Sequence, residues 1–381
     1  MTPAGKRGRR SIGSGKRGKT RHVLVTGYPG FLGKRLVAHI LKSEPETNLY
    51  LLVQEKFHED ANRYVSSFRG AKKRVRLFVG DIAKMHLGLS AEEVKHLART
   101  VTDIYHLAAI SYLGVADDYM WKVNVGGTRN VIDLAGECRR LGRLNHMSSC
   151  FVSGNQHGVV LEDELELGQS FRNNYERTKF EAEKAVRAAM EQLPVTIYRP
   201  SIVVGDSRTG EIGRMEGPYY LGLLLASSPA TVPHPLPGDG TAPVHMVPVD
   251  YATEAVYVLS TDPAARGRCF HIVDPNPLAV RHVYNLLADR VGKGRSRVRV
   301  PAGLVKGVLR LPVVERYTRA YRQAVDYLTT MVFYSHSNTD ELLGGRLHCP
   351  PFTTYVDRLI EYVQATYRAR RDAQERDPLD G

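Results

Sequence analysis

Three side chains in the middle of the chain have the types and the spacing to exchange a proton with an oxygen atom. Tyr175 and Lys179 are four residues apart, so on a helix they lie on one face about one turn apart. A free tyrosine, with a pKa of about 10, is a poor base, but a neighbouring ammonium lowers that pKa. This spacing is also common in ordinary amphipathic helices. Ser149, at the end of the preceding apolar segment, makes the pattern specific because it could donate a hydrogen bond to the same oxygen.

A second set of residues has the spacing of a phosphate-binding turn. Gly27, Gly30 and Gly33 follow the apolar segment 22–26 and lead into a helix-like segment. In that position the first glycine permits a tight turn, the second lets the backbone approach a pyrophosphate, and the third lets the helix pack on the strand. The free amides of the helix then face the anion. The residues assigned to this dinucleotide site are Thr26, Gly27, Gly30, Phe31, Leu32 and Gly33.

The residues after the second apolar segment are expected beside the adenosine ribose, where a carboxylate favours NAD and a basic group favours NADP. The order Gln54, Glu55, Lys56 does not decide between them. Because side chains alternate along a strand, Gln54 and Glu55 are expected to face opposite ways, with Gln54 beside the ribose and Lys56 near a 2′-phosphate. This weakly favours NADP(H), with NAD(H) as the alternative. Asp81 either contacts the adenine or caps the following turn.

Short apolar segments alternate with amphipathic ones through the first half of the chain. The pattern predicts strands at 22–26, 49–53, 75–79, 104–107, 144–147 and 195–198, and helices at 31–42, 91–98, 128–141 and 175–192. Apolar strands separated by amphipathic helices indicate a parallel sheet with helices on both faces. We therefore predict an α/β, Rossmann-type doubly wound fold. His106 is expected in the fourth strand, and the acidic run 162–164 is expected in a solvated loop.

The amino-acid composition changes after Arg199-Pro200. Residues 201–245 are rich in Gly and Pro and contain an apolar run at 219–226, which we call the apolar island. This half is expected to be a smaller substrate-binding part that could return strands to the first sheet. The predicted division is a basic tail, a nucleotide-binding domain, a substrate-binding part and a charged C-terminal tail, at 1–21, 22–200, 201–366 and 367–381.

The net charge of +13 is concentrated at the N-terminus, where residues 1–21 hold eight Lys and Arg and no acid. This stretch is expected to be disordered. It is either a solvated extension or a weak electrostatic contact with nucleic acid or anionic lipid.

No apolar run approaches the ~20 residues that span a bilayer, and the N-terminus lacks the apolar core of a signal peptide. Four separated cysteines fit a reducing compartment, and the histidines show no metal-site spacing. We therefore expect a cytoplasmic protein without a metal.

From about residue 22 to residue 365 the chain resembles the extended short-chain dehydrogenases/reductases. The matching stretches are Thr26 to Gly33, Gly80-Asp81-Ile82, His106 to Ala109, Val123 to Thr128, Ser148-Ser149, Tyr175 to Lys179 and Tyr198 to Ser201. Within that superfamily the chain is most similar to the thioester-reductase-like, or male-sterility (fatty acyl reductase), branch, on residues 30–33, 174–183 and 199–206. Members of this branch reduce acyl thioesters to aldehydes or alcohols with NADPH. Many carry an arginine where this chain has Gln54. We expect any thioester to be supplied from elsewhere, because residues 1–381 contain no carrier or adenylation domain.

The resemblance implies a role for each catalytic candidate. Ser149 would orient the substrate oxygen, Tyr175 would be the acid/base, and Lys179 would bind the nicotinamide ribose while lowering the pKa of Tyr175. Asn124 matches a position that supports the active site, although it could instead cap the long helix that follows.

The resemblance also implies further cofactor contacts. Ala108 and Ala109 would line the nicotinamide end, and Asp81 with Ile82 would lie at the adenosine end, while Tyr175 and Lys179 would touch the cofactor as well.

The leading hypothesis is an NAD(P)-dependent oxidoreductase acting on a carbonyl, carbinol or acyl thioester of a lipophilic substrate. The apolar island 219–226 suggests that the substrate is lipophilic, although such an apolar run more often packs in a protein core. A nucleotide-sugar epimerase or dehydratase, or a hydroxysteroid-type dehydrogenase, would use the same residues. A cofactor-sensing scaffold with a nucleic-acid-binding tail is the non-enzymatic alternative, and the intact Ser149, Tyr175 and Lys179 count against it. A homodimer is compatible with each hypothesis.

Overall fold

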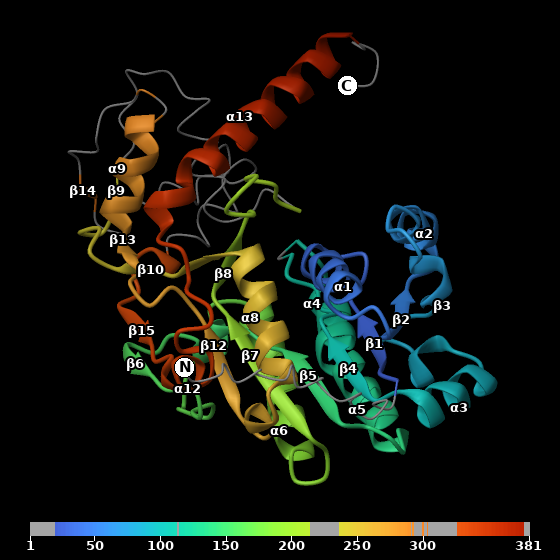
Figure 1. The fold of residues 1–381 in the computed structure, drawn as a ribbon. Coiled ribbons are helices and arrows are strands. Elements are labelled where there is room, and N and C mark those ends of the chain that lie inside the picture. Colours follow the sequence, from blue (N-terminus) through green and yellow to red (C-terminus); the bar gives the residue numbers. More distant parts are fainter. Residues whose placement is uncertain are drawn as a thin grey trace, which may run out of the picture.

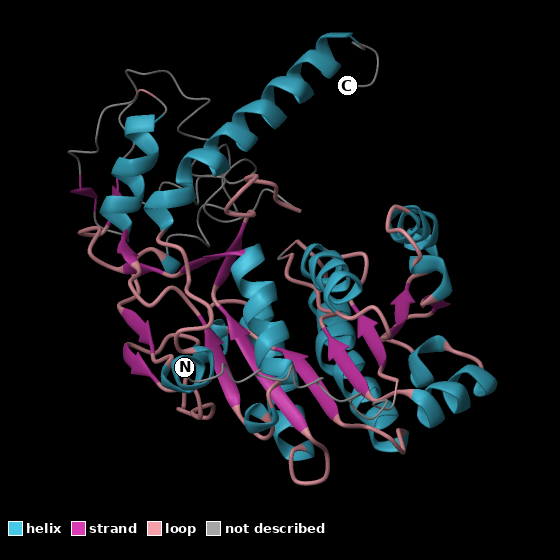
Figure 2. Ribbon diagram, viewed as in Figure 1, coloured by secondary structure: helices cyan, strands magenta, loops and turns pink. Residues whose placement is uncertain are grey.

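A seven-stranded sheet forms the centre of the chain (Figure 1; Figure 2). The computed structural model describes residues 20–112, 114–213, 236–290 and 326–376, with 292, 299–300 and 303 between the last two ranges. In spatial order the strands are β12 (Cys269–Ile272), β7 (Val195–Pro200), β5 (Arg143–Met147), β4 (Asp103–His106), β1 (His22–Thr26), β2 (Asn48–Val53) and β3 (Val75–Val79). Every pair of neighbours is parallel, which confirms the predicted α/β fold.

The strand order reverses between β1 and β4. In open parallel sheets, ligands bind beyond the carboxyl ends of the strands at such a reversal. All six expected strands are present, and His106 ends β4 as predicted. The seventh strand, β12, pairs with β7 through Ile272 and Pro200, so residues after 200 complete the sheet.

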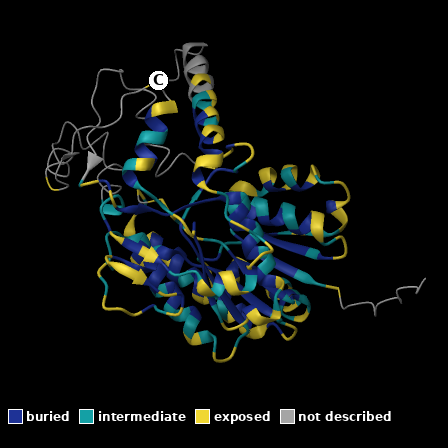
Figure 3. Cartoon of the chain, turned by 60° about the vertical axis from the view of Figure 1, so that its left-hand side comes forward, coloured by how far each residue is buried: buried dark blue, intermediate teal, exposed yellow. Residues whose placement is uncertain are grey.

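Helices cover both faces of the sheet, and their buried sides fit the strand pattern. α1 (Phe31–Ser43) and α8 (Val249–Thr261) pack on the face that holds Val23 and Val25. The opposite face, which holds Leu24, is covered by α3 (Ala91–Thr100), α5 (Gly127–Glu137) and α6 (Asn174–Ala189). In Figure 3 the strands are mostly buried and the outer helix surfaces are exposed. Strands buried on both faces explain why their sequences read as short apolar runs.

Shorter elements that the sequence pattern did not predict complete this half of the chain. They are α2 (His58–Ser66), α4 (Asp117–Trp121), a π-helical turn η4 (Lys122–Gly126) and the 3-10 turns η1 (Glu55–Phe57), η2 (Ala71–Lys73), η3 (Met85–Gly88), η5 (Cys150–Ser153) and η6 (Pro263–Ala265). The helix expected at 128–141 is α5, which ends at Glu137 and so is shorter than expected at its C-terminal end. The elements α4 and η4 precede it directly in the chain.

The C-terminal half has its own apolar cluster, built from α9 (Val280–Arg290) and α13 (Phe352–Arg376). Figure 1 shows both helices on one side of the sheet's upper end. The remaining elements are α12 (Ser337–Leu343) and the pairs β8 (Ile202–Val204) with β11 (Met246–Pro248), β6 (Gly158–Val160) with β15 (Val332–Tyr334), β10 (Pro243–Val244) with β13 (Leu278–Ala279), and β9 (Leu236–Pro237) with β14 (Arg299–Val300). Helix α13 continues past residue 367, where the charged tail was expected to begin. The apolar island 219–226 lies outside the described residues.

The N-terminal boundary is set by Arg21, which was expected in the basic tail. Its guanidinium is ion-paired with Glu44 at 2.6 Å and with Asp103 at 3.1 Å, so this residue belongs to the folded part. Residues 1–19 lie outside the described ranges. Across those ranges, no helix combines the length and apolar character needed to cross a membrane.

Candidate active site

The glycine turn lies where the strand order reverses. Gly27 has a φ of +83°, and a Cβ there would lie 2.6 Å from the backbone nitrogen of Ala108 on the turn after β4. A Cβ on Gly30 or Gly33 would lie 2.6 Å or 2.7 Å from the carbonyl oxygen of Gly27. Only glycine fits at all three positions, and α1 begins directly behind the turn at Phe31. The turn therefore has the shape and the helix N-terminus that hold a dinucleotide pyrophosphate.

A buried polar chain ties this turn to the neighbouring strand and helix. The hydroxyl of Thr128 donates to the Asn124 carbonyl at 2.6 Å, so it accepts from Nε2 of His106 at 3.0 Å. Nδ1 of His106 is then the acceptor for the Thr26 hydroxyl at 2.8 Å, and the Thr26 oxygen accepts from the Ala108 amide at 3.3 Å. Burial, and then the charge of Lys179, lower the pKa of His106 to about 3. A neutral His106 therefore holds the ends of β1 and β4 together.

Asn124 is a link between the loop after β4 and helix α6. Its Oδ1 accepts from the Ile110 amide at 2.7 Å, and its Nδ2 donates to the Ile110 carbonyl and to Thr178 Oγ1, both at 3.0 Å. The alternative that Asn124 caps the long helix is wrong, because it lies inside η4 and α5 has no side-chain cap. The unpredicted π-helical turn gives Asn124 this position, a feature that helix periodicity cannot show.

The two serines at the end of β5 have different partners. The hydroxyl of Ser148 donates to Glu183 Oε2 at 2.5 Å. Ser149 caps η5, and its oxygen accepts from the Phe151 amide at 3.3 Å. Because the Ser148 hydroxyl donates to Glu183, Ser149 is the better candidate of the two to donate to a substrate oxygen.

Helix α6 carries Tyr175 and Lys179, and Lys179 lies beside the carboxyl end of β5. The helix begins at an Asn173 cap whose Oδ1 accepts from the Glu176 amide at 3.0 Å. The ammonium of Lys179 is buried and donates to the Met147 carbonyl at 2.6 Å, two residues before Ser149. Burial lowers the pKa of Lys179 to about 8, although Glu183 acts in the opposite direction. Tyr175 is half-buried in the first turn of the helix.

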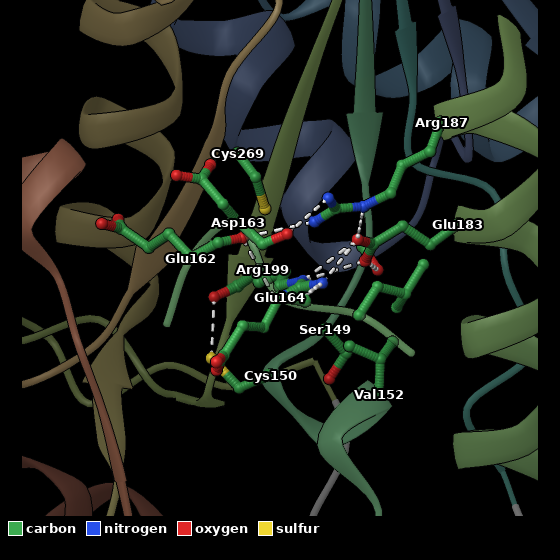
Figure 4. A network of polar contacts seen from close by, with 12 residues as sticks. Ser149, Cys150, Val152, Glu162, Asp163, Glu164, Glu183, Arg187, Arg199 and Cys269 are labelled. Atoms are coloured by element: carbon green, nitrogen blue, oxygen red, sulfur yellow. Dashed lines mark hydrogen bonds and ion pairs between the residues drawn. The ribbon is translucent and has the colours of Figure 1, made fainter. Parts of the chain in front are cut away.

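A buried ion network behind Ser149 joins α6 to β7 (Figure 4). Arg199 donates to the Glu183 carboxylate through Nε at 3.0 Å and Nη2 at 2.7 Å. Arg187 Nε donates to Glu183 Oε1 at 2.9 Å. Burial by itself would raise the pKa of Glu183, but Arg199, then Arg187 and Ser148, lower it from 4.5 to about 2. Glu183 therefore stays ionised and fixes the helix that carries Lys179.

The prediction that the acidic run 162–164 is solvated is wrong for Glu162, which is 3% exposed. Its carboxylate accepts from the backbone amides of His271 at 2.9 Å, Asn338 at 2.6 Å and Thr339 at 3.2 Å. Two of these amides belong to the first turn of α12, where a helix N-terminus attracts a carboxylate. These three amides lie far from Glu162 along the chain, so the local run of acidic residues gave no sign that Glu162 is buried.

At the adenosine end, the expected alternation of Gln54 and Glu55 is wrong. Strand β2 ends at Val53, and a 3-10 turn follows with Gln54 as its N-cap, so the period of two stops before these residues. Gln54 Nε2 donates to Asp81 Oδ2 at 3.1 Å, and Asp81 Oδ1 accepts from the Ala83 amide at 2.9 Å. The turn-capping alternative for Asp81 is therefore observed.

The remaining cofactor candidates are spread around this edge. Lys56 is exposed, with its ammonium 4.9 Å from the centre of the Phe57 ring. Ile82 is buried against Gly127, and a Cβ added to Gly127 would lie 2.6 Å from Cδ1 of Ile82. Ala108 is half-buried and Ala109 is exposed in the turn after β4. Within the described part of the chain, no cluster of three or more His, Cys, Asp or Glu side chains could hold a metal ion.

A hollow of about 520 Å³ lies at the N-terminal end of α6. Its lining residues come from the loop before the helix and from its first turn, and they are Ser170, Phe171, Arg172, Asn173, Asn174 and Arg177.

The parallel sheet and its glycine turn define the class of extended short-chain dehydrogenases/reductases, which are nicotinamide-dependent oxidoreductases. The chain belongs to the male sterility protein family, whose NAD-binding profile matches residues 25–256.

Two curated relatives show what this family includes. The chain is 28% identical over 285 residues to a fatty acyl-CoA reductase, wat, of Drosophila melanogaster, covering 64% of this chain and 54% of that protein. It is 28% identical over 271 residues to a linear gramicidin synthase protein of Brevibacillus parabrevis, covering 67% of this chain and 5% of that protein. The chain therefore spans about half or less of the length of these relatives.

Solved structures agree with the fold. The terminal R domain from the myxalamid PKS-NRPS biosynthetic pathway superposes with a TM-score of 0.77 at 26% identity, covering 92% of each chain. A UDP-glucuronic acid 4-epimerase from Bacillus cereus, solved with NAD, has a TM-score of 0.67 at 18% identity, covering 91% of this chain and 98% of that one. The second likeness shows the fold alone.

Proposed function

We propose that this chain reduces an acyl thioester, or the carbonyl derived from it, on a lipophilic substrate, with Ser149, Tyr175 and Lys179 as its catalytic residues. One observation carries the proposal. The buried Lys179 ammonium donates to the Met147 carbonyl, which joins the catalytic helix to the end of the strand that leads into Ser149. The two named relatives, a fatty acyl-CoA reductase and a linear gramicidin synthase protein, support a thioester substrate.

The residues of the glycine turn fit a dinucleotide, because a Cβ at Gly27, Gly30 or Gly33 would collide with backbone atoms of Ala108 or Gly27. Only glycine therefore permits the tight turn that sets the N-terminus of α1 to face a pyrophosphate. We assign Thr26, Phe31 and Leu32 to the same site. When bound, the nicotinamide supplies the hydride. Asp81 and Ile82 would hold the adenosine end, and Ala108 and Ala109 the nicotinamide end.

The protein side chains would supply the proton and hold the substrate. Tyr175 donates its phenolic proton to the oxygen that becomes an alcohol or hemithioacetal. Lys179 carries a positive charge below a pH of about 8 and, one helical turn from Tyr175, would bind the nicotinamide ribose. Ser149 donates a hydrogen bond to the same oxygen. Asn124 supports them through its bond to Thr178, between Tyr175 and Lys179.

We further propose NADP(H) as the preferred cofactor by a modest margin, and a cytoplasmic location. Gln54, the residue at the end of β2, is neutral and does not repel a 2′-phosphate. The side-chain amide of Gln54 donates a hydrogen bond to Asp81, which would keep the Gln54 side chain at the proposed adenosine end of the site. A nucleotide-sugar epimerase or dehydratase is the second candidate, because such an enzyme would use the same Ser149, Tyr175 and Lys179.

The test is a fluorescence titration with NADPH and NADH, followed by a substrate panel. The panel contains an acyl-CoA, an acyl-pantetheine, a ketone and a UDP-sugar, with absorbance at the nicotinamide band as the readout. We expect oxidation of the reduced cofactor with the thioesters. Interconversion of the UDP-sugar without net cofactor oxidation would support the epimerase instead. Binding of a cofactor with no turnover of any substrate would favour the non-catalytic alternative.

A further inference from the structure

A polar cluster outside the proposed catalytic residues joins the segment 326–334 to the first turn of α6. Tyr327 OH accepts from Asn173 Nδ2 at 2.8 Å, and Thr330 Oγ1 accepts from Arg172 Nη2 at 2.9 Å. Arg172 is ion-paired with Glu176 at 3.0 Å, and its guanidinium lies 5.2 Å from the centre of the Tyr327 ring. The Glu176 side chain is fully buried. This cluster joins the segment 326–334 to the N-terminal end of the helix that carries Tyr175.

Asn173, whose side chain donates to Tyr327, is the N-cap residue of α6. Its Oδ1 caps α6 by accepting from the Glu176 amide at 3.0 Å, and its Nδ2 donates to Tyr327. Both ends of the cap side chain are therefore engaged, two residues before Tyr175. A cap held at both ends fixes the direction in which the first helical turn begins.

The same segment also touches the turn that carries Ser149. The Tyr327 and Phe151 rings meet edge to face with their centres 4.9 Å apart, and the Phe151 amide donates to Ser149 Oγ. Tyr334 OH lies 3.2 Å from Ser153 Oγ in the last residue of η5. Tyr327 is thus in contact with the cap of the Tyr175 helix through its hydroxyl and with the serine turn through its ring.

We propose that Tyr327 is a positioning residue that sets the distance between Ser149 and Tyr175. The inference rests on the proposed function, because it assumes that these two residues act on one substrate oxygen. Tyr327 acts through Asn173 and Phe151. Misplacement of reacting groups by about 1 Å can lower a rate by about a hundredfold. A single side chain that links both groups is therefore expected to affect turnover more than cofactor binding.

Graded variants at Tyr327 test the proposal. Tyr327→Phe keeps the ring and removes the hydroxyl, whereas Tyr327→Leu removes both contacts. With an acyl-CoA and NADPH, we expect kcat to fall about tenfold in the first and about a hundredfold in the second. The cofactor Kd should stay within about twofold, because the glycine turn lies on another strand. The matched control is Tyr257→Phe, which loses a 2.9 Å bond from its hydroxyl to Glu44 on the α1 side and should keep the native kcat.

A double-mutant cycle separates positioning from general loss of structure. Asn173→Ser keeps an oxygen for the helix cap and removes the donor to Tyr327. If the pair acts through this bond, Asn173→Ser combined with Tyr327→Phe should lower kcat no further than either single change. Additive losses of kcat, or a native kcat in Tyr327→Leu, would overturn the proposal.

Amide hydrogen exchange distinguishes failure of this inference from failure of the proposed function. The Glu176 amide is bound to Asn173 and the Gly154 amide to the Phe151 carbonyl. The Glu176 amide should exchange about tenfold faster in Tyr327→Phe, both amides should do so in Tyr327→Leu, and both should keep the native rate in Tyr257→Phe. Faster exchange in a protein that reduces no thioester would support the positioning role and refute the substrate. Native exchange and native kcat in Tyr327→Phe, in a protein that Tyr175→Phe inactivates, would refute the positioning role alone.

Discussion

Replacing Glu183 with Gln tests whether the buried ion network holds helix α6 in place. Glu183 is 0% exposed and Arg199 is 1% exposed, so the change leaves a buried guanidinium without its counter-charge. Glutamine keeps the size and one acceptor oxygen of the side chain, while its amide nitrogen replaces an oxygen that accepts at least two hydrogen bonds.

The size of the effect can be worked out in two ways. A shift of one pKa unit corresponds to about 1.4 kcal/mol, so the lowering of the Glu183 pKa from 4.5 to about 2 corresponds to about 3 kcal/mol. Removing one partner of a buried ion pair costs about 3–5 kcal/mol. We therefore expect Glu183→Gln to lower the free energy of unfolding by about 3 kcal/mol.

The assay is urea unfolding followed by circular dichroism, at neutral pH and through an acid series. Because the folded pKa of Glu183 lies below its ordinary value, the native protein gains stability from this group above pH 4.5 and loses it as the pH falls towards about 2. The variant should lack that part of the acid dependence. The matched control is Glu166→Gln, which breaks an exposed 2.8 Å pair with Lys184 and should change stability by less than about 1 kcal/mol.

Equal effects of Glu183→Gln and Glu166→Gln on the free energy of unfolding would refute this reasoning. So would an acid dependence that is the same in the native protein and in Glu183→Gln.

Three further predictions concern the proposed cofactor site and Lys179. Gly30→Ala places a methyl group 2.6 Å from the Gly27 carbonyl and should weaken NADPH binding, whereas Gly136→Ala on α5, with nothing within 4 Å, should bind normally in the same titration. Gln54→Asp should lower NADPH affinity by about tenfold or less, and tighter NADH than NADPH binding by the native protein would contradict the preference. Because the folded pKa of Lys179 is about 8 rather than 10.5, its burial should destabilise the fold below pH 8 and less so as the pH rises to 10.5. Lys179→Met should remove that dependence in urea unfolding.

Much of the sheet could be predicted from local sequence because parallel strands buried on both faces are short apolar runs. All six predicted strands are present, and the glycine spacing located the tight turn between β1 and α1. The seventh strand, β12, could not be assigned locally. It pairs with a strand about seventy residues earlier, and such pairings follow from tertiary packing rather than from periodicity.

The sequence was less informative about how the candidate residues are held. The π-helical turn that carries Asn124 and the 3-10 turn after β2 both interrupt regular periods. The alternative of a helix cap at Asn124 and the expected alternation at Gln54 were therefore wrong. Glu162 and Tyr327 have partners far along the chain, at α12 and at the start of α6. No local pattern marks a residue whose partner is supplied by a distant segment.

The most direct test of the proposed function is the turnover of Tyr175→Phe with an acyl-CoA and NADPH. The variant keeps the ring and lacks the phenolic proton, and loss of a general acid commonly lowers a rate by about 10²- to 10⁴-fold. Tyr119→Phe, an exposed tyrosine on α4, is the matched control and should have native turnover. We predict that Tyr175→Phe binds NADPH with nearly native affinity and loses turnover to that extent. A near-native rate in Tyr175→Phe, on any substrate that the native protein reduces, would contradict the proposed mechanism.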